Sequence, residues 1–497
     1  MIRLFLSTVL FVAECLLCYV MLALVLGPMI PFISVFYIFK VAERVIVKVT
    51  SGAFPLPSLD AVFVTEKDED QANINALLCF ENRGNVEDEI NNIRQAILER
   101  LVDAKKTNGE LLYPKVRCYF RPGWFQYFLQ KDDCFKIEKH VFKWQGDVPR
   151  SKDELAAIVS KLSNEPLPEG RSPWYGCCIP TNFGDNDIVV MVKMNHAIAD
   201  GISLARFLTQ KFSDTVIPAK HSQNVSTTSR KLFLAKAALT TPRHLFKLLF
   251  SSADRSILHG PNLSGVKKAA WYEAFDLKLI KEIKTATGTT VNDVLMSCLS
   301  LALRRYSQRK GVKNPDDLTI SIPVNLRSSA LSKELAFENN VSFIYPELAV
   351  ATDGILKQLY ETKTRMNEAK VSAEPLASAA VLFLSQELCP GFLTSKANNF
   401  LISKASCIFS NVPGPQQMLT VKGSRIKYMI FWPPHKGNTG VGLSIFTYAG
   451  HVIFGAYGDI SVLSDPEIIV EEFGSAVNEM ARCFRGHNNS CISNGQP

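Results

Sequence analysis

The first forty residues contain one long apolar run, which limits what the start of the chain can become. Between Leu4 and Phe39, Glu14 is the only side chain that is charged at neutral pH. The run exceeds the ~20 apolar residues that a helix needs to cross a bilayer. It is also longer than the apolar core of a cleaved signal peptide, and Val25-Leu26-Gly27-Pro28 is a poor cleavage site. We therefore expect residues 1–50 to form a membrane anchor.

The segment Gly27-Pro28-Met29-Ile30-Pro31 interrupts this run, because proline and glycine both disfavour a continuous helix. Two geometries follow: a single span from Leu4 to Leu26 with a kinked exit, or a hairpin that enters the bilayer and returns. Basic residues flank both ends of the run, and by the positive-inside rule this favours the hairpin with both flanks in the cytosol. These residues are Arg3, Lys40, Arg44 and Lys48.

Length and composition narrow the class of protein. At 497 residues the chain is long enough for two domains. The formal net charge of +8 comes from 55 basic residues scattered among 47 acidic ones, without the basic stripe of a nucleic-acid-binding protein. The 12 cysteines lack the paired spacing of metal ligands, so we expect no metal site and reduced thiols facing the cytosol.

Residues 221–265 are expected to form a crossover between two domains, at 55–220 and 266–485. The crossover begins with a Ser/Thr-rich boundary at 221–230 and continues with basic residues interleaved with leucine and phenylalanine. This pattern predicts an amphipathic helix on an anionic membrane surface, or else a helix that covers one domain with its charged face in water. The basic residues are Arg230, Lys231, Lys236, Arg243, His244 and Lys247.

Hydrophobic periodicity predicts the elements of the two domains. We expect helices over 86–105, 153–164 and 352–368, strands over 318–327, 339–350 and 406–415, and a hairpin around Ala449-Gly450. Helices and strands alternate in both parts. The prediction is an α/β fold of two halves with mixed sheets and a ligand cleft between them.

One motif carries the chemistry of an acid–base catalyst. The apolar strand from Ile188 to Met194 ends in Asn195-His196, and Asp200-Gly201 then opens a helix. Histidine suits such a position because its pKa, near ~6.5, allows it to move protons at neutral pH.

The order of motifs resembles the wax ester synthase/diacylglycerol acyltransferase family. Asn195-His196-x-x-x-Asp200-Gly201 is similar to its HHxxxDG signature, and Asn292-Asp293-Val294 is similar to its second motif. "SNVPGP" and "GLSIFTYAGHVIFGAYGD" resemble its C-terminal domain, and shorter echoes such as "LPSLDAVFV" and "ENNVSFIYPEL" lie between Leu56 and Asp465. The resemblance implies two chloramphenicol-acetyltransferase-like domains, the fold of CoA-dependent acyltransferases.

The resemblance also implies roles for the motif residues. His196 is the general base, a role typically worth ~10²–10⁴-fold in rate. The family's first histidine is replaced by Asn195, which cannot take up a proton at neutral pH. Asn292 is a candidate oxyanion donor or a structural donor.

The remaining motif residues have structural as well as functional interpretations. Asp200 would orient the loop through backbone hydrogen bonds or by pairing with Arg327. Gly201 would supply a conformation or a close approach that a Cβ forbids. Asp293 has either a functional role or the stabilising role of an acid at a helix N-terminus. Asn195, Gly201 and Asp293 are the expected substrate contacts.

The predicted activity is membrane-bound O-acyl transfer. Acyl-CoA is the co-substrate and no cofactor is bound; the acceptor is a long-chain alcohol, giving wax esters, or diacylglycerol, giving triacylglycerol. The expected location is the endoplasmic reticulum membrane, with the catalytic body facing the cytosol and membrane lipids as partners. Two alternatives stay open: transfer to another alcohol, and a catalytically silent relative that binds acyl chains.

Overall fold

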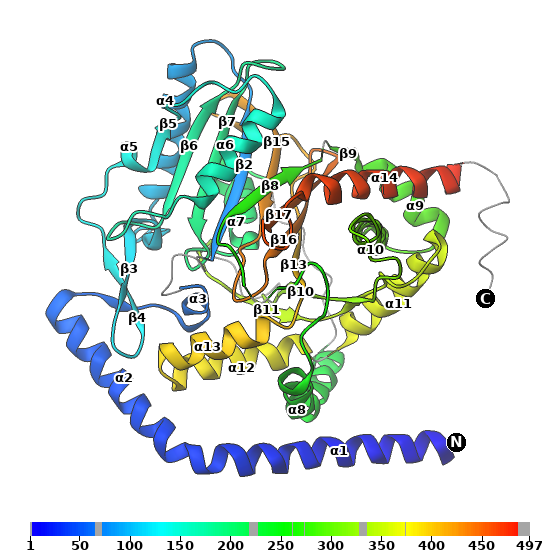
Figure 1. Cartoon of the computed structure of the whole chain (residues 1–497). Coiled ribbons are helices and arrows are strands. Elements are labelled where there is room, and N and C mark those ends of the chain that lie inside the picture. Colours follow the sequence, from blue (N-terminus) through cyan, green and yellow to red (C-terminus); the bar gives the residue numbers. More distant parts are fainter. Residues whose placement is uncertain are drawn as a thin grey trace.

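The structure is a computed structural model that describes residues 2–64, 72–217, 227–260, 262–272, 274–327, 335–372 and 374–485 (Figure 1). Two mixed sheets form its centre. The first sheet has six strands, of which β5 and β6 are parallel and the other neighbours antiparallel. Its order is β14 (Thr420–Val421), β15 (Ser424–Trp432), β2 (Asn73–Phe80), β7 (Ile188–Asn195), β6 (Trp174–Pro180) and β5 (Val141–Lys143).

The second sheet has eight strands, and β10, β13 and β16 run parallel. The main path is β11 (Val341–Ile344), β10 (Leu318–Asn325), β13 (Cys407–Pro413), β16 (Val441–Tyr448), β17 (His451–Asp459) and β8 (Lys267–Trp271), with β12 (Glu347–Leu348) on β10 and β9 (Phe275–Asp276) on β17. Every residue of β16 is buried, as expected for a strand covered on both faces. A third, small sheet joins β1 (Phe54–Pro55), β4 (Tyr127–Lys131) and β3 (Cys118–Pro122).

Amphipathic helices cover the sheets. In α4 (Val86–Ile97), Ile90 and Ile93 face the core, and the Asn85 side chain caps the first turn by accepting from the backbone N–H of Glu87. The other helices of the two halves are α3 (Ser58–Ala61), α5 (Ile137–His140), α6 (Lys152–Asn164), α7 (Gly201–Phe207), α9 (Leu277–Thr287), α10 (Val291–Arg309), α11 (Ile355–Val371), α12 (Glu374–Leu388), α13 (Gly391–Ile402) and α14 (Pro466–Arg485).

Most of the predicted elements are confirmed within a few residues. The helix expected over 86–105 is α4, extended by a wider turn over Leu98–Val102, and the helix expected from residue 352 begins at Ile355. The predicted hairpin turns at Ala449 and Gly450, which both have positive φ, as the tightest hairpin turns require. Most of the boundary expected at 221–230 lies outside the described residues, and its last part begins α8 (Thr227–Phe250).

One strand crosses between the halves. β15 belongs to the second half of the sequence but pairs with β2 in the first sheet, from Ile426 opposite Phe80 to Trp432 opposite Asn75. The domain bounds of 55–220 and 266–485 stay a prediction, to which the structure adds that the two halves share this strand.

The N-terminal apolar run forms α1 (Ile2–Leu26) and α2 (Ile30–Ser51), joined by a tight turn at Gly27–Met29. Figure 1 shows α2 turning away from α1 without folding back on it, so the two helices do not form a hairpin. α1 lies along α8, where Glu14 pairs with Arg243 at 2.9 Å.

The basic flank of this run is part of the folded body. Lys40 donates to the carbonyl oxygens of Gln386 and Cys389, and Arg44 pairs with Glu387 at 3.1 Å. Glu43, 6% exposed, accepts from the backbone N–H groups of Trp124 and Phe125. Two of the three charges that suggested a cytosolic flank after the run therefore have partners within the protein.

These contacts predict unequal costs for two acidic residues of the N-terminal helices. Glu43→Ala removes a buried, charged acceptor from two part-buried backbone N–H groups, which should lower the free energy of unfolding by about 1–3 kcal/mol. Glu14→Ala removes a half-exposed ion pair worth about 0–1 kcal/mol. Thermal unfolding in mild detergent measures both, and equal effects of the two variants would contradict the assignment of α2 to the body.

Candidate active site

The motif histidine stands on a tight loop between β7 and α7. The backbone N–H of His196 donates to the carbonyl oxygen of Ala72 at 2.8 Å, which fixes the loop to the start of β2. The side-chain oxygen of Asn195 accepts from the N–H of Ala197 at 3.0 Å, and the Asn195 carbonyl accepts from the N–H of Ile198 at 3.0 Å. Asn195 therefore closes the turn, a role for which asparagine is well suited.

The imidazole of His196 lies in an apolar setting. Its ring stacks on the ring of Phe63, with centroids 4.0 Å apart, and no described residue forms a hydrogen bond with its Nδ1. Burial lowers the pKa of His196 to about 4, while the Asp200 carboxylate acts in the opposite direction. The ring is neutral at pH 7 and can accept a proton, which a general base must do.

Asp200 fixes the other end of the loop. Its Oδ1 caps α7 by accepting from the N–H of Ser203 at 2.8 Å, and its Oδ2 accepts from the N–H of Asn340 at 3.0 Å. The guanidinium of Arg327 lies 2.8 Å from the same carboxylate, and both side chains are buried. The predicted pairing of Asp200 with Arg327 is confirmed.

A buried network that the sequence did not reveal supports the loop from beneath. The Asn339 amide donates to the carbonyl oxygen of His196 and to Asp60, both at 2.8 Å. Lys115 pairs with Asp60 and donates to two further loop carbonyls at 3.3 Å. Asp60 and Phe63 lie in "LPSLDAVFV" and Asn339 lies in "ENNVSFIYPEL". Both stretches resemble the family, but the resemblance alone does not assign these residues to the support of the His196 loop.

His196, Asp200 and Gly201 line a cavity of about 530 Å³ between the two sheets. Its walls come from β2, β7 and β15 on one side and from β10 and β13 on the other, together with α4 and α7. The size and the apolar walls are typical of sites for small molecules. The few polar groups on the walls include Ser321, Asn325, Ser410, Asn411 and Lys436.

The second motif lies behind this cavity. Asn292 is not among the residues that line it in the described part of the chain, but its side-chain oxygen accepts from the Asn411 amide at 3.1 Å, and Asn411 does line it. Asp293 forms a capping box with Thr290 at the start of α10 and is 1% exposed. The structure thus places Asp293 at a helix N-terminus, as its structural interpretation requires.

The reason given for Gly201 is wrong. Gly201 has no positive φ, and an added Cβ would meet the Val412 side chain at 3.4 Å, an ordinary contact distance. Neither the backbone conformation nor a close approach demands glycine here. Gly201 lines the cavity, so what a side chain there would change is the space available to a ligand.

Comparison with known proteins agrees with this geometry. Residues 56–257 match the wax ester synthase/diacylglycerol acyltransferase catalytic domain, and residues 337–481 match the C-terminal domain of the same family. The chain belongs to the wax ester synthase/diacylglycerol acyltransferase family. It is an acyltransferase of that family, and the match includes His196 and its loop.

Individual relatives have low sequence identity to this chain, but the similarity extends over most of its length. Wax ester synthase/diacylglycerol acyltransferase 11 of Arabidopsis thaliana is 24% identical over 391 residues, covering 68% of this chain and 79% of the relative. The solved wax ester synthase/diacylglycerol acyltransferase from Marinobacter aquaeolei VT8 superposes with a TM-score of 0.62 at 19% identity, covering 87% of this chain and 100% of that one. The trichothecene 15-O-acetyltransferase from Fusarium sporotrichioides has a TM-score of 0.59 at 10% identity, with coverage of 87% and 95%. The predicted two-part acyltransferase fold is confirmed.

The geometry predicts that His196→Ala removes activity without unfolding the protein. Loss of a general base should lower kcat by ~10²–10⁴-fold. Backbone groups of His196 and the carboxylate of Asp200 hold the loop and are kept in this variant, so the melting temperature should stay near that of the wild type. Ester formation and thermal unfolding measure the two effects, and near-normal turnover of the variant would refute the assignment.

The lowered pKa of His196 predicts the pH profile. A neutral imidazole is required, and one with the ordinary pKa of about 6.5 would be half protonated at that pH. Because burial lowers the pKa, kcat/KM for the acceptor should stay level as the pH falls from 8 to 6 and decline only in more acidic solution. An inflection near pH 6.5 would show that the base is solvated.

Proposed function

We propose that this protein transfers a fatty acyl group from acyl-CoA to the hydroxyl of a long-chain alcohol or of diacylglycerol, forming wax esters or triacylglycerol. The observation that carries the proposal is the neutral His196 imidazole at the wall of a large, apolar cavity between the sheets. Such a cavity favours substrates with hydrocarbon chains over sugars or ions.

The reaction follows from the position of the base. His196 takes the proton of the acceptor hydroxyl as its oxygen attacks the thioester carbonyl carbon, and a carbon–oxygen bond forms. The tetrahedral oxyanion then collapses, the carbon–sulfur bond breaks, and the imidazolium returns its proton to the CoA thiolate. The products are an ester and free CoA, so neither a metal nor a bound cofactor is needed.

Asn411 is our candidate donor to the oxyanion, with Asn292 as its positioning residue. Asn411 lines the cavity and uses one of its amide hydrogens on Asn292, which leaves a second hydrogen for a ligand. A donor aimed at the developing charge in a dry site typically contributes a few kcal/mol. In this proposal the oxyanion donor is Asn411, and Asn292, for which that role was one prediction, holds the Asn411 amide.

Membrane attachment is part of the proposal. The helical segment Val9–Ser51 is long and apolar enough to cross a bilayer, and 6% of its most apolar window is buried in the protein. We propose attachment to the endoplasmic reticulum with the body in the cytosol, where acyl-CoA is available. Apolar acceptors and products dissolve in the bilayer, so an enzyme fixed there meets them at high local concentration.

The alternative of a silent acyl-binding relative loses its only support. That support was Asn195 in place of a histidine, but the Asn195 side chain closes the turn and does not line the cavity among the described residues. The alternative of another acceptor alcohol remains for experiment.

Purified protein supplied with labelled acyl-CoA and a panel of alcohols tests the proposal. Hexadecanol or dioleoylglycerol should yield labelled ester, and the wild type should exceed His196→Ala with each productive acceptor. Esters formed only with a sterol or a small alcohol would overturn the acceptor class. Acyl-CoA binding without any ester would overturn the enzymatic function.

A further inference from the structure

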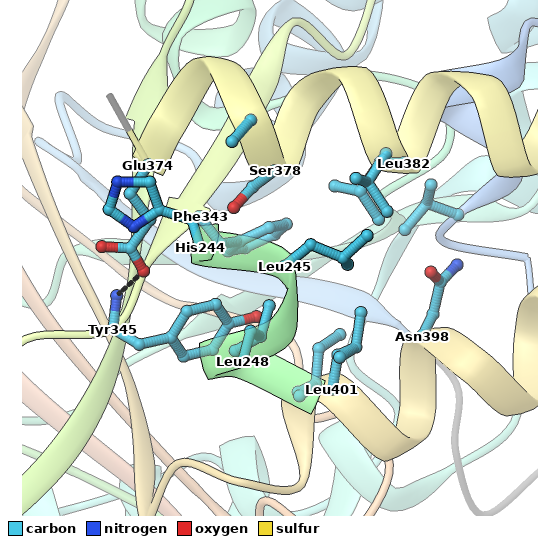
Figure 2. A pocket seen from close by; sticks show the side chains of 14 residues that line it. His244, Leu245, Leu248, Phe343, Tyr345, Glu374, Ser378, Leu382, Asn398 and Leu401 are labelled. Atoms are coloured by element: carbon cyan, nitrogen blue, oxygen red, sulfur yellow. Dashed lines mark hydrogen bonds between the residues drawn. The ribbon is translucent and has the colours of Figure 1, made fainter. Parts of the chain in front are cut away.

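A second cavity lies between α8, α12, α13 and the end of β11 (Figure 2). Its volume is about 40 Å³, room for only a few small groups. Figure 2 shows Leu245 and Leu248 of α8 beside it, Leu382 on α12 and Leu401 on α13. We call this space the lower chamber.

The lower chamber lies next to the catalytic cavity. Phe343 and Ile402 line both spaces. Val62 lines the lower chamber, and the following residue, Phe63, lines the catalytic cavity and stacks on His196. Phe343 and Ile402 therefore form part of a shared wall between the chamber and the catalytic cavity.

The same three helices also carry exposed apolar side chains. In Figure 1, α8, α12 and α13 lie together beside α1 at the bottom of the molecule. Exposed apolar patches rimmed by lysine are typical of surfaces that rest on anionic bilayers. The exposed apolar residues of the three helices are Leu234, Leu249, Phe250, Phe383, Leu384, Phe392, Leu393 and Phe400, and exposed lysines among them are Lys236, Lys247 and Lys396.

One buried polar group in the chamber has no partner. The side chain of Asn398 on α13 is 3% exposed and lines the chamber, and its Nδ2 donates to nothing among the described residues. Leaving a buried donor unpaired costs about 1–3 kcal/mol, so such a group is commonly satisfied by a ligand or by water. A hydroxyl or ester oxygen would be a suitable acceptor.

We propose that the lower chamber is the closed inner end of an entrance from the bilayer, through which the lipid acceptor reaches His196. The hydrocarbon chain passes between α8, α12 and α13, and Asn398 donates to an oxygen of the acceptor on its way. At about 40 Å³ the chamber admits a chain only when lining side chains such as Phe343 turn aside. The inference rests on the proposed acyl transfer to a lipid alcohol.

Ala377→Phe narrows the chamber, and Ala380→Phe is its matched control. Ala377 is buried and lines the chamber, whereas Ala380 lies on the same helix and is exposed. With hexadecanol in phosphatidylcholine vesicles as acceptor, Ala377→Phe should lower kcat/KM by about tenfold or more, a typical effect of filling an apolar passage. Transfer to water-soluble butanol should be unchanged, because a small alcohol does not need this route, and Ala380→Phe should leave both rates unchanged.

Ser378→Leu, on a residue that lines the same chamber, replaces Ala377→Phe if thermal unfolding shows that the latter does not fold. Asn398→Leu should raise KM for hexadecanol and leave the rate with butanol unchanged. The proposed entrance would be overturned if the variants lost equal activity with hexadecanol and with butanol. It would also be overturned if the narrowing variants kept their kcat/KM for hexadecanol. A wild type that esterifies neither alcohol nor diacylglycerol would instead overturn the proposed function.

Discussion

The buried pair of Asp200 and Arg327 is the interaction on which the site depends. His196 and Asp200 belong to the first half of the chain, but three of the residues that hold their loop, Arg327, Asn339 and Asn340, come from the second half. Removing one partner of a buried pair leaves an uncompensated charge and typically costs 3–5 kcal/mol. His196 therefore has its place only when both halves are packed together, and neither half carries all the residues of the candidate site.

The shared strand has the same consequence. β15 (Ser424–Trp432) lies between β14 and β2, so the first sheet is completed by a segment far beyond β7 (Ile188–Asn195) in the sequence. The first sheet and the His196 loop therefore both depend on the packing of the two halves against each other. Met429 to Phe431 of β15 also line the cavity, so the strand contributes to the site as well as to the fold.

The sequence predicted what depends on local pattern. β7, α7 and the hairpin at Ala449-Gly450 follow from apolar runs and turn residues, and the pairing of Asp200 with Arg327 follows from opposite charges in two motifs. It did not predict the exchange of β15, because an apolar strand does not encode its neighbour. It did not predict the contacts of Lys40 and Arg44 for a related reason: a basic residue after an apolar run looks the same whether it faces water or a carbonyl group.

The errors at single residues have physical causes as well. Gly201 was assigned a backbone role because glycine often has positive φ, yet here it begins a helix with ordinary geometry. The prediction for Asn292, an oxyanion donor or a structural donor, stays open, because whether a residue near a helix N-terminus reaches a cavity depends on tertiary packing. Asn411, the amide that does line the cavity, sits in "SNVPGP" among residues that otherwise indicate a strand and a turn.

In the proposed function, the apolar cavity that buries His196 is also the cavity that would take up the lipid substrate. The apolar walls that suit a hydrocarbon chain in the proposed function also lower the pKa of His196, which makes the imidazole a weaker base but keeps it unprotonated. A site open to water would hold a stronger base, and water would then compete with the alcohol for the acyl group. For an enzyme that esterifies lipids, a dry cavity therefore both accepts the hydrocarbon chain and keeps water from the acyl group. The acceptor must then enter without crossing water. The helices α8, α12 and α13, with their exposed apolar side chains and the lower chamber between them, are suited to that passage.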